Sequence, residues 1–116
     1  MKKLFDLEER TYQFSRRCRD FVKKQPKTIA NVEYGKQLVR SSGSQAANYI
    51  EANEALSKKD FNHRIKICRK EAKESKLWLR LYDVNMADSL QEEQKLLNQE
   101  AIELTKFFSS IVEKSK

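Results

Sequence analysis

The feature that most constrains this 116-residue sequence is an apolar repeat with alternating steps of four and three residues between positions 61 and 86. At 100° per residue these steps keep the side chains on one side of a helix, and the period of 3.5 favours left-handed helix packing. Ser57 and Asp60 precede the repeat as a capping box, which predicts a helix over about residues 58–85. The members of the repeat are Phe61, Ile65, Cys68, Ala72, Ser75, Leu79, Tyr82 and Met86.

Two further segments predict helices with similar spacing near the ends of the chain. Asp6 with Glu9 forms a capping box for a first helix over about residues 6–24, which Pro26 ends. Ser89 with Glu92 opens a last helix over about residues 89–114 in the same way. The predicted core residues are Leu7, Thr11, Phe14, Cys18 and Phe21 in the first helix, and Leu90, Gln94, Leu97, Ala101, Leu104, Phe108 and Ile111 in the last.

The long segment between Pro26 and Ser57 predicts a second helix over about residues 28–56, opened by Thr28. Its middle, residues 41–44, is either a loop or a kink with close backbone packing, and the Gln-Ala-Ala that follows favours the kink. The apolar residues of the segment share one stripe, which we expect to face the core. They are Ile29, Val32, Val39, Ala46 and Ile50, with Leu56 closing the run.

The connections between these four helices are all short. They lie near residues 25–27, 57–59 and 85–88, so none can cross over the bundle. Successive helices must then be antiparallel, which predicts an all-α, up-down-up-down four-helix bundle with residues 1–116 in a single domain. Cys18 and Cys68 fall on apolar stripes and are expected to be small core residues of a cytoplasmic protein. No apolar run approaches the ~20 residues that cross a bilayer, so we expect no membrane partner.

The sequence offers little for catalysis. The single histidine, His63, lies on the polar side of its helix without an obvious partner, and there is no Cys-x-x-Cys pair. Gly35 and Gly43 stand apart, so there is no glycine-rich phosphate loop. We therefore expect no enzymatic activity, no metal and no cofactor, and we expect Glu51 and Glu71 to make interhelical hydrogen bonds or ion pairs.

Charge is the strongest functional signal. The chain has 24 Lys and Arg against 17 Asp and Glu, a net charge of +7, yet residues 85–116 hold four basic and six acidic side chains. A basic row in the third helix advances in steps of three and four, and only Asp83 is spaced to neutralise it within the helix. A second row recurs every seven residues in the first helix. The rows are Lys66, Arg69, Lys73, Lys76 and Arg80 in the third helix, and Arg10, Arg17 and Lys24 in the first.

Two kinds of partner would satisfy these basic residues. Phosphate groups of RNA or DNA would contact them without much sequence readout, and the net positive charge favours this interpretation. The alternative is an acidic protein partner, or the acidic last helix of the same or a neighbouring subunit. The acidic residues available there are Glu92, Glu93, Glu100 and Glu103.

Apolar residues outside the core stripes of the third and fourth helices indicate a contact between subunits. Trp78 and Phe107 are large and have aliphatic neighbours at helical spacing, so we expect this second apolar face to be buried against another copy. The alternative is that single exposed apolar residues are ordinary. The expected interface residues are Ile67, Trp78, Leu81, Leu96 and Phe107.

Residues 44–61 resemble a motif of a known bacterial family. The chain reads Ser-Gln-Ala-Ala-Asn-Tyr-Ile-Glu-Ala from Ser44 and Ser-Lys-Lys-Asp-Phe from Ser57, with Asp60 where the family usually has Glu. It resembles the four-helix-bundle proteins first recognised as products of intervening sequences in 23S ribosomal RNA genes. Relatives of that family include the accessory variability determinants of diversity-generating retroelements. The positions that match the family pattern are Asn48, Glu51, Ser57 and Phe61.

The resemblance implies a small bundle that assembles into a ring-like homopentamer without enzymatic activity of its own. In the retroelement branch it also implies binding to nucleic acid and to a reverse transcriptase. Asn48 and Glu51 are three residues apart and can satisfy free backbone groups at the end of a neighbouring helix, so we interpret them as fold-defining. Charge and resemblance together predict a non-enzymatic, homo-oligomeric nucleic-acid-binding accessory protein that acts as a scaffold.

Overall fold

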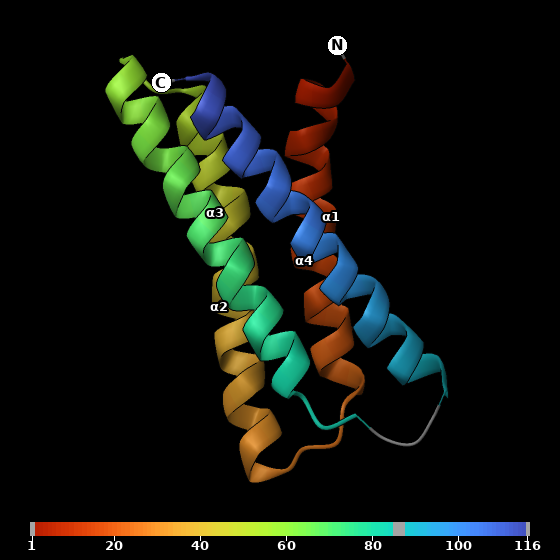
Figure 1. Cartoon of the computed structure of the whole chain (residues 1–116). Helices are drawn as coiled ribbons and strands as arrows, with labels where there is room; N and C mark the ends of the chain where they lie inside the picture. The colour runs from red at the N-terminus through yellow and green to blue at the C-terminus, as the bar shows by residue number, and fades with distance from the viewer. Residues whose placement is uncertain (1, 85–87, 116) are drawn as a thin grey trace.

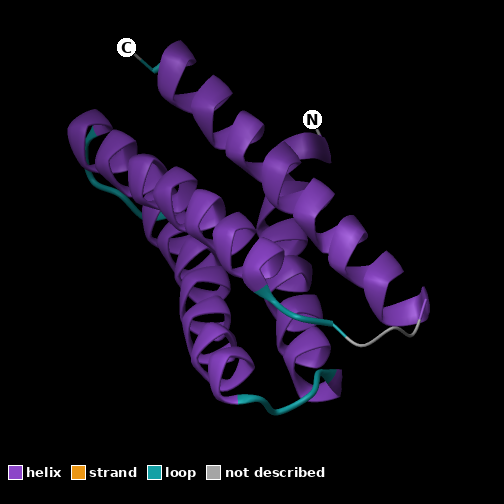
Figure 2. Cartoon of the chain, turned by 60° about the horizontal axis from the view of Figure 1, so that its bottom comes forward, coloured by secondary structure: helices purple, strands orange, loops and turns teal. Residues whose placement is uncertain are grey.

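Four helices of alternating direction pack into a bundle (Figure 1). This computed structural model describes residues 2–84 and 88–115, the side chains of residues 2–6 and 88 excepted. The helices are α1 (Lys2–Lys24), α2 (Ile29–Asn53), α3 (Lys58–Leu81) and α4 (Asp88–Lys114). α2 and α3 lie side by side along their length, whereas α4 runs obliquely to them (Figures 1 and 2). The predicted all-α four-helix bundle is confirmed.

Caps confirm two of the predicted helix starts. Thr28 precedes α2, and its Oγ1 accepts a hydrogen bond from the Asn31 N–H at 3.1 Å. Ser57 precedes α3, and its Oγ accepts one from the Asp60 N–H at 3.0 Å. Each cap satisfies a backbone donor that the first turn leaves free, an interaction typically worth about 1 kcal/mol.

Some other predicted boundaries differ from the structure. α1 begins at Lys2, four residues before the predicted start, and α4 begins at Asp88, one residue before it, so Asp6 and Ser89 lie inside their helices. α2 ends three residues before the predicted position 56, and α3 ends four residues before position 85. The predicted core residue Met86 lies outside the described residues.

The buried stripes of α1, α3 and α4 follow the predicted spacing. All five predicted core residues of α1 are at most 4% exposed, and the five in α3 from Ile65 to Leu79 are buried, as is Tyr82 directly after it. Removing each large apolar side chain from water contributes about 1.5–3 kcal/mol, so these stripes hold the bundle together. The predicted residues that are only half-buried are Phe61, Leu90, Gln94 and Ile111.

Cys18 and Cys68 are buried free thiols, as predicted. Burial raises the pKa of Cys18 far above its ordinary value and raises the pKa of Cys68 to about 12. Both side chains therefore stay protonated and serve as small apolar core residues.

The predicted core stripe of α2 is wrong. Five of its six residues are exposed, with exposed fractions from 42% to 99%, and Ala46 is half-buried. The exposed five are Ile29, Val32, Val39, Ile50 and Leu56. The side of α2 that faces the bundle carries mainly polar and small residues, namely Asn31, Gly35, Leu38, Ser41, Ser42, Gln45, Tyr49 and Ala52.

Hydrogen bonds to neighbouring helices allow this polar side of α2 to be buried. The Nε2 of Gln45 donates to the backbone oxygen of Thr11 in α1 at 2.9 Å. The hydroxyl oxygens of Ser41 in α2 and Ser75 in α3 are 2.7 Å apart. Because a buried polar group is costly only when it lacks a partner, these contacts replace the apolar stripe that the other helices use.

The middle of α2 is helical throughout, so the loop alternative for residues 41–44 is excluded. Small residues in this segment let the backbone approach α1. A Cβ built on Gly43 would lie 3.8 Å from the Oγ of Ser15, an ordinary van der Waals contact.

Candidate nucleic-acid interface

The outward side of α3 is a continuous basic surface. Three of the five predicted residues are exposed, and Arg69 and Lys76 are half-buried. None of the five forms an ion pair with a side chain that the structure describes. This includes the pair between Arg80 and Asp83 that the spacing allows. This α3 basic surface consists of Lys66, Arg69, Lys73, Lys76 and Arg80.

Basic residues continue this surface to the start of α3. Lys58 and Lys59 line a shallow hollow of about 560 Å³ together with Lys66, and a second hollow of about 390 Å³ includes Lys66 and Lys73. Lys59, Lys66, Lys73 and Arg80 are seven residues apart, so they form one row of about 32 Å on the helix. The sequence prediction missed Lys58 and Lys59, although the same seven-residue spacing leads to Lys59.

The acidic residues of α3 face α2 instead. Arg40 of α2 lies 3.4 Å from Glu71 and 3.0 Å from Glu74. The pair with Arg40 confirms the predicted interhelical ion pair of Glu71, whereas Glu51 is exposed and has no ion pair with a described residue. Glu71 and Glu74 of α3 thus pair with α2, whereas the α3 basic surface has no described ion-pair partner.

Two of the three residues in the basic row of α1 form ion pairs inside the chain. Arg10 donates hydrogen bonds to Glu100 at 2.7 and 2.9 Å and to Glu103 at 2.7 Å. Its guanidinium also lies 5.0 Å from the ring centroid of Phe107, a cation–π contact. The hydrogen bond with Glu100 is the main reason that the pKa of Arg10 is raised above its ordinary value. Arg10 therefore ties α1 to α4.

Arg17 belongs to the same seam between α1 and α4. Its Nε lies 3.8 Å from a carboxylate oxygen of Glu93. Lys24, the third member of this row, is exposed and has no ion pair with a described side chain. For Arg10 and Arg17, the structure therefore favours the predicted alternative, pairing with the acidic last helix, over phosphate contact.

Three of the four motif residues have structural roles at α2 and α3. The Oδ1 of Asn48 accepts a hydrogen bond from Arg64 of α3 at 3.0 Å. The prediction that Asn48 satisfies backbone groups at a helix end is wrong, because its interhelical partner is a side chain. Ser57 caps α3, and Phe61 packs against the core. Glu51 is exposed.

The two aromatic residues of the predicted subunit interface pack against their own chain. Trp78 stacks on Tyr34 of α2 with ring centroids 6.3 Å apart, and Phe107 lies beneath Arg10. Both rings thus have intramolecular partners, which removes the main reason for placing a subunit there. Of the other three residues, Ile67 is half-buried, and Leu81 and Leu96 are exposed.

The described residues contain no group of three or more His, Cys, Asp and Glu side chains that could hold a metal ion. His63 is exposed on α3. Within residues 2–84 and 88–115, no helix combines the length and apolar character that a bilayer crossing requires.

Fold and surface together define a basic four-helix-bundle protein with one long cationic face. The model of the 23S rRNA-intervening sequence protein family matches residues 4–110, so the chain belongs to that family. It is also similar to the crystal structure of a protein of unknown function from the S23 ribosomal protein family of Bacteroides thetaiotaomicron VPI-5482. The two chains are 28% identical, the match covers 91% of this chain and 97% of the other, and the TM-score is 0.73. No curated protein matches the chain.

Proposed function

We propose that the protein is a homo-oligomeric nucleic-acid-binding accessory protein that contacts phosphate groups through α3. It acts as a cytoplasmic scaffold without catalytic activity of its own. The resemblance to the intervening-sequence family and its retroelement relatives adds two elements to the proposal, a ring of five subunits and a reverse transcriptase as a protein partner.

The observation that carries this proposal is the lack of any described ion-pair partner for the α3 basic surface. Glu100, Glu103 and Glu93 of α4 are engaged by arginines of α1, and Glu71 and Glu74 are engaged by Arg40. Three of the four α4 carboxylates that were expected to compete for α3 are therefore in use elsewhere, and the fourth, Glu92, has no described ion pair with α3. Cations in a row without internal carboxylates attract the phosphates of a nucleic acid backbone.

The arrangement favours backbone contact over base recognition. The cationic row of about 32 Å contains only Lys and Arg, whose contacts with phosphates position a nucleic acid without specifying its sequence. Base stacking needs an available aromatic ring, and Trp78 of α3 is stacked on Tyr34. We therefore expect similar affinity for unrelated sequences of the same length.

Salt dependence of binding tests the proposal directly. Five phosphate contacts per subunit predict a slope of log K against log salt of about −3.5 for a single strand or about −4.5 for a duplex. Between about 50 and 200 mM salt, affinity measured by fluorescence anisotropy should fall roughly 100- to 500-fold.

A charge-reversing pair in α3 identifies the surface. Arg69→Glu with Lys73→Glu should flatten the slope by about 1.4 to 1.8 and weaken binding equally for unrelated sequences. The matched control, Lys95→Glu with Lys106→Glu, makes the same change in net charge on exposed positions of α4 and should retain most of the slope. Equal loss in both variants, or unchanged binding in the α3 variant, contradicts the proposal. Binding to polyglutamate with no binding to RNA or DNA would instead support an acidic protein partner.

A further inference from the structure

α2 presents an apolar face to solvent on the side that adjoins α1. Val32, Val39 and Ile50 are each between 42% and 49% exposed, and their spacing places them on one side of the helix. This side adjoins α1, because a Cβ built on Gly35 would lie 3.0 Å from Cγ1 of Val22. Large apolar side chains in a row at helical spacing indicate a surface that is covered in the functional state.

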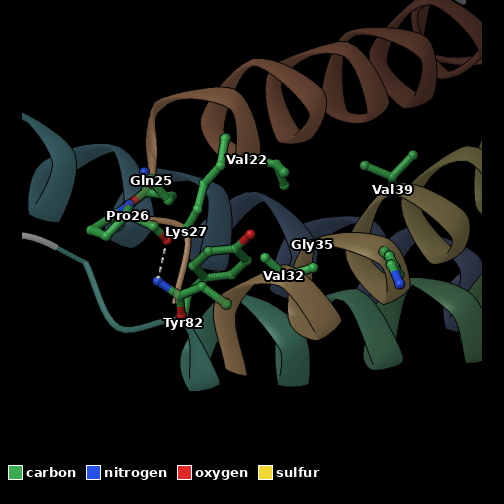
Figure 3. Close-up of a pocket in the computed structure, with 10 residues that line it drawn as sticks. Val22, Gln25, Pro26, Lys27, Val32, Gly35, Val39 and Tyr82 are labelled. Carbon is green, nitrogen blue, oxygen red and sulfur yellow. Dashed lines mark hydrogen bonds between the residues drawn. The ribbon is translucent and has the colours of Figure 1, made fainter. Parts of the chain in front are cut away.

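Part of this face is a groove of about 520 Å³ between α1 and α2 (Figure 3). Val22, Val32 and Val39 line it, together with the ring of Tyr82, whose hydroxyl lies beside Gly35 (Figure 3). The groove is mainly apolar, and the ammonium groups in its lining come from Lys27 and Lys36. It is therefore suited to an apolar side chain carried on an acidic helix.

We infer that this α1–α2 face binds α4 of a second copy of the chain, with Leu96 entering the groove. The inference rests on the oligomeric part of the proposed function and names the two surfaces that meet. Leu96 is 48% exposed and belongs to a stripe of steps of four, three and four along α4. The members of this stripe are Glu92, Leu96, Gln99 and Glu103.

Charge complementarity selects α4 as the occupant. Lys27 has no ion pair with a described residue, and Lys36 has only a surface pair with Glu33 at 3.5 Å. Glu92 is exposed and likewise has no described ion pair, so it presents an unpaired negative charge one turn before Leu96. A basic rim would thus meet an acidic flank.

The other exposed apolar pair on the bundle is a poorer match. Leu77 and Leu81 of α3 are 46% and 44% exposed, but Leu77 shares a hollow with four cations, Lys66, Arg69, Lys70 and Lys73, and one carboxylate, Glu74, which pairs with Arg40. Bringing that surface against the basic rim of the groove would place like charges together.

The position of the two surfaces allows a ring to close. Leu96 lies on the same side of α4 as Glu93 and Glu100, and these two residues pair with α1. The stripe of α4 that contains Leu96 is therefore next to α1 on one side, and the α1–α2 face is next to α1 on the other. The groove adjoins the α1–α2 connection, and Leu96 lies in the first half of α4, which begins at the same end of the bundle (Figure 1). Two different surfaces on adjacent sides of the bundle make a head-to-tail contact, which generates a ring where the rotation between subunits closes.

Light scattering during size-exclusion chromatography tests the apolar contact. The parent should elute as a multiple of 13.7 kDa, and Val32→Glu with Val39→Glu, or Leu96→Glu alone, should raise the midpoint concentration for assembly at least about tenfold. These positions are exposed within the subunit, so helix content by circular dichroism should be unchanged. The matched control, Leu77→Glu with Leu81→Glu, alters two equally exposed leucines and should assemble like the parent.

Charge reversal tests which surfaces meet. Lys36→Glu and Glu92→Lys should each weaken assembly, and combining them in one chain should restore it, because the pair is then again of opposite sign. A parent that is monomeric at micromolar concentration overturns the oligomeric part of the proposed function together with this inference. A parent oligomer that persists in both the Val32/Val39 and the Leu96 variants, or that dissociates in the Leu77/Leu81 control, overturns this inference alone.

Discussion

Asn31 offers the sharpest test of how a polar side of α2 is held inside the bundle. Its side chain is buried and joins two connections of the fold, donating to the backbone oxygens of Pro26 at 3.0 Å and Asp83 at 2.8 Å. Its Oδ1 accepts a hydrogen bond from the Asp83 N–H at 3.1 Å. Asn31→Asp keeps the shape and the acceptor but removes both donors.

The expected cost of Asn31→Asp is about 3 kcal/mol at neutral pH. Two hydrogen bonds are lost at about 1 kcal/mol each, and the new carboxylate is buried against two carbonyl oxygens, which adds at least a further ~1 kcal/mol. For a chain of this length, a loss of about 3 kcal/mol corresponds to a fall in Tm of roughly 12 °C. Gln37→Glu makes the same chemical change at an exposed position of α2 and should alter stability by less than about 0.5 kcal/mol.

Urea denaturation of both variants, followed by circular dichroism, measures these free energies. The carbonyl oxygens disfavour the charged form of the introduced carboxyl at position 31, so its pKa in the folded chain should exceed its unfolded value. A group with a raised folded pKa contributes most stability below its unfolded pKa and loses that contribution as the pH rises. The deficit of the Asn31 variant should therefore be smaller at about pH 4 than at about pH 7. A loss below 1 kcal/mol, or a deficit that grows on acidification, would refute this account of Asn31.

Two further predictions concern the seam between α1 and α4 and the contact of α2 with α1. Arg10→Met leaves Glu100 without its partner and should cost about 1–2 kcal/mol in urea, whereas adding Glu100→Leu should recover most of that loss. Gly35→Ala places a Cβ 2.6 Å from the Tyr82 hydroxyl and should lower Tm, and adding Tyr82→Phe should restore part of it. Gly43→Ala has no such contact and should stabilise the chain by about 0.5–1 kcal/mol.

Apolar spacing predicts all four helices but the buried side of only three, because in α1, α3 and α4 the apolar stripe is also the buried one. In α2 the residues at apolar spacing, such as Val32 and Val39, are on the outside. Their period identifies a helix with an apolar side but cannot say which side faces its own bundle. That choice depends on partners far apart in sequence, such as the backbone of Thr11 for Gln45.

The proposed phosphate-binding surface could be predicted only where it depends on local spacing within one helix. The lack of ion pairs in the α3 basic surface follows from local spacing, since acidic residues three and four positions away are almost absent. The structure forms no ion pair between these five residues and a described carboxylate. Whether Arg10 is available to bind phosphate depends on Glu100, ninety positions away. No local pattern in the sequence shows that α1 and α4 bring these two residues together. Sequence reasoning therefore assigned Arg10 and Arg17 to the same surface as α3, whereas the fold uses them as ties to α4.

The two proposed surfaces are compatible because of where α3 lies. α3 packs against α2 and α4 and does not contact α1 within the described residues. If the two surfaces on either side of α1 form the contacts between subunits, α1 of each subunit faces the centre of the ring. α3 then lies on the outside of the ring in every subunit. Each subunit then adds one cationic row of about 32 Å to the perimeter, and several weak phosphate-contacting rows on one rigid ring bind a long nucleic acid far more tightly than one row alone. Assembly would in this way supply the affinity that sequence-independent contacts in a single chain cannot.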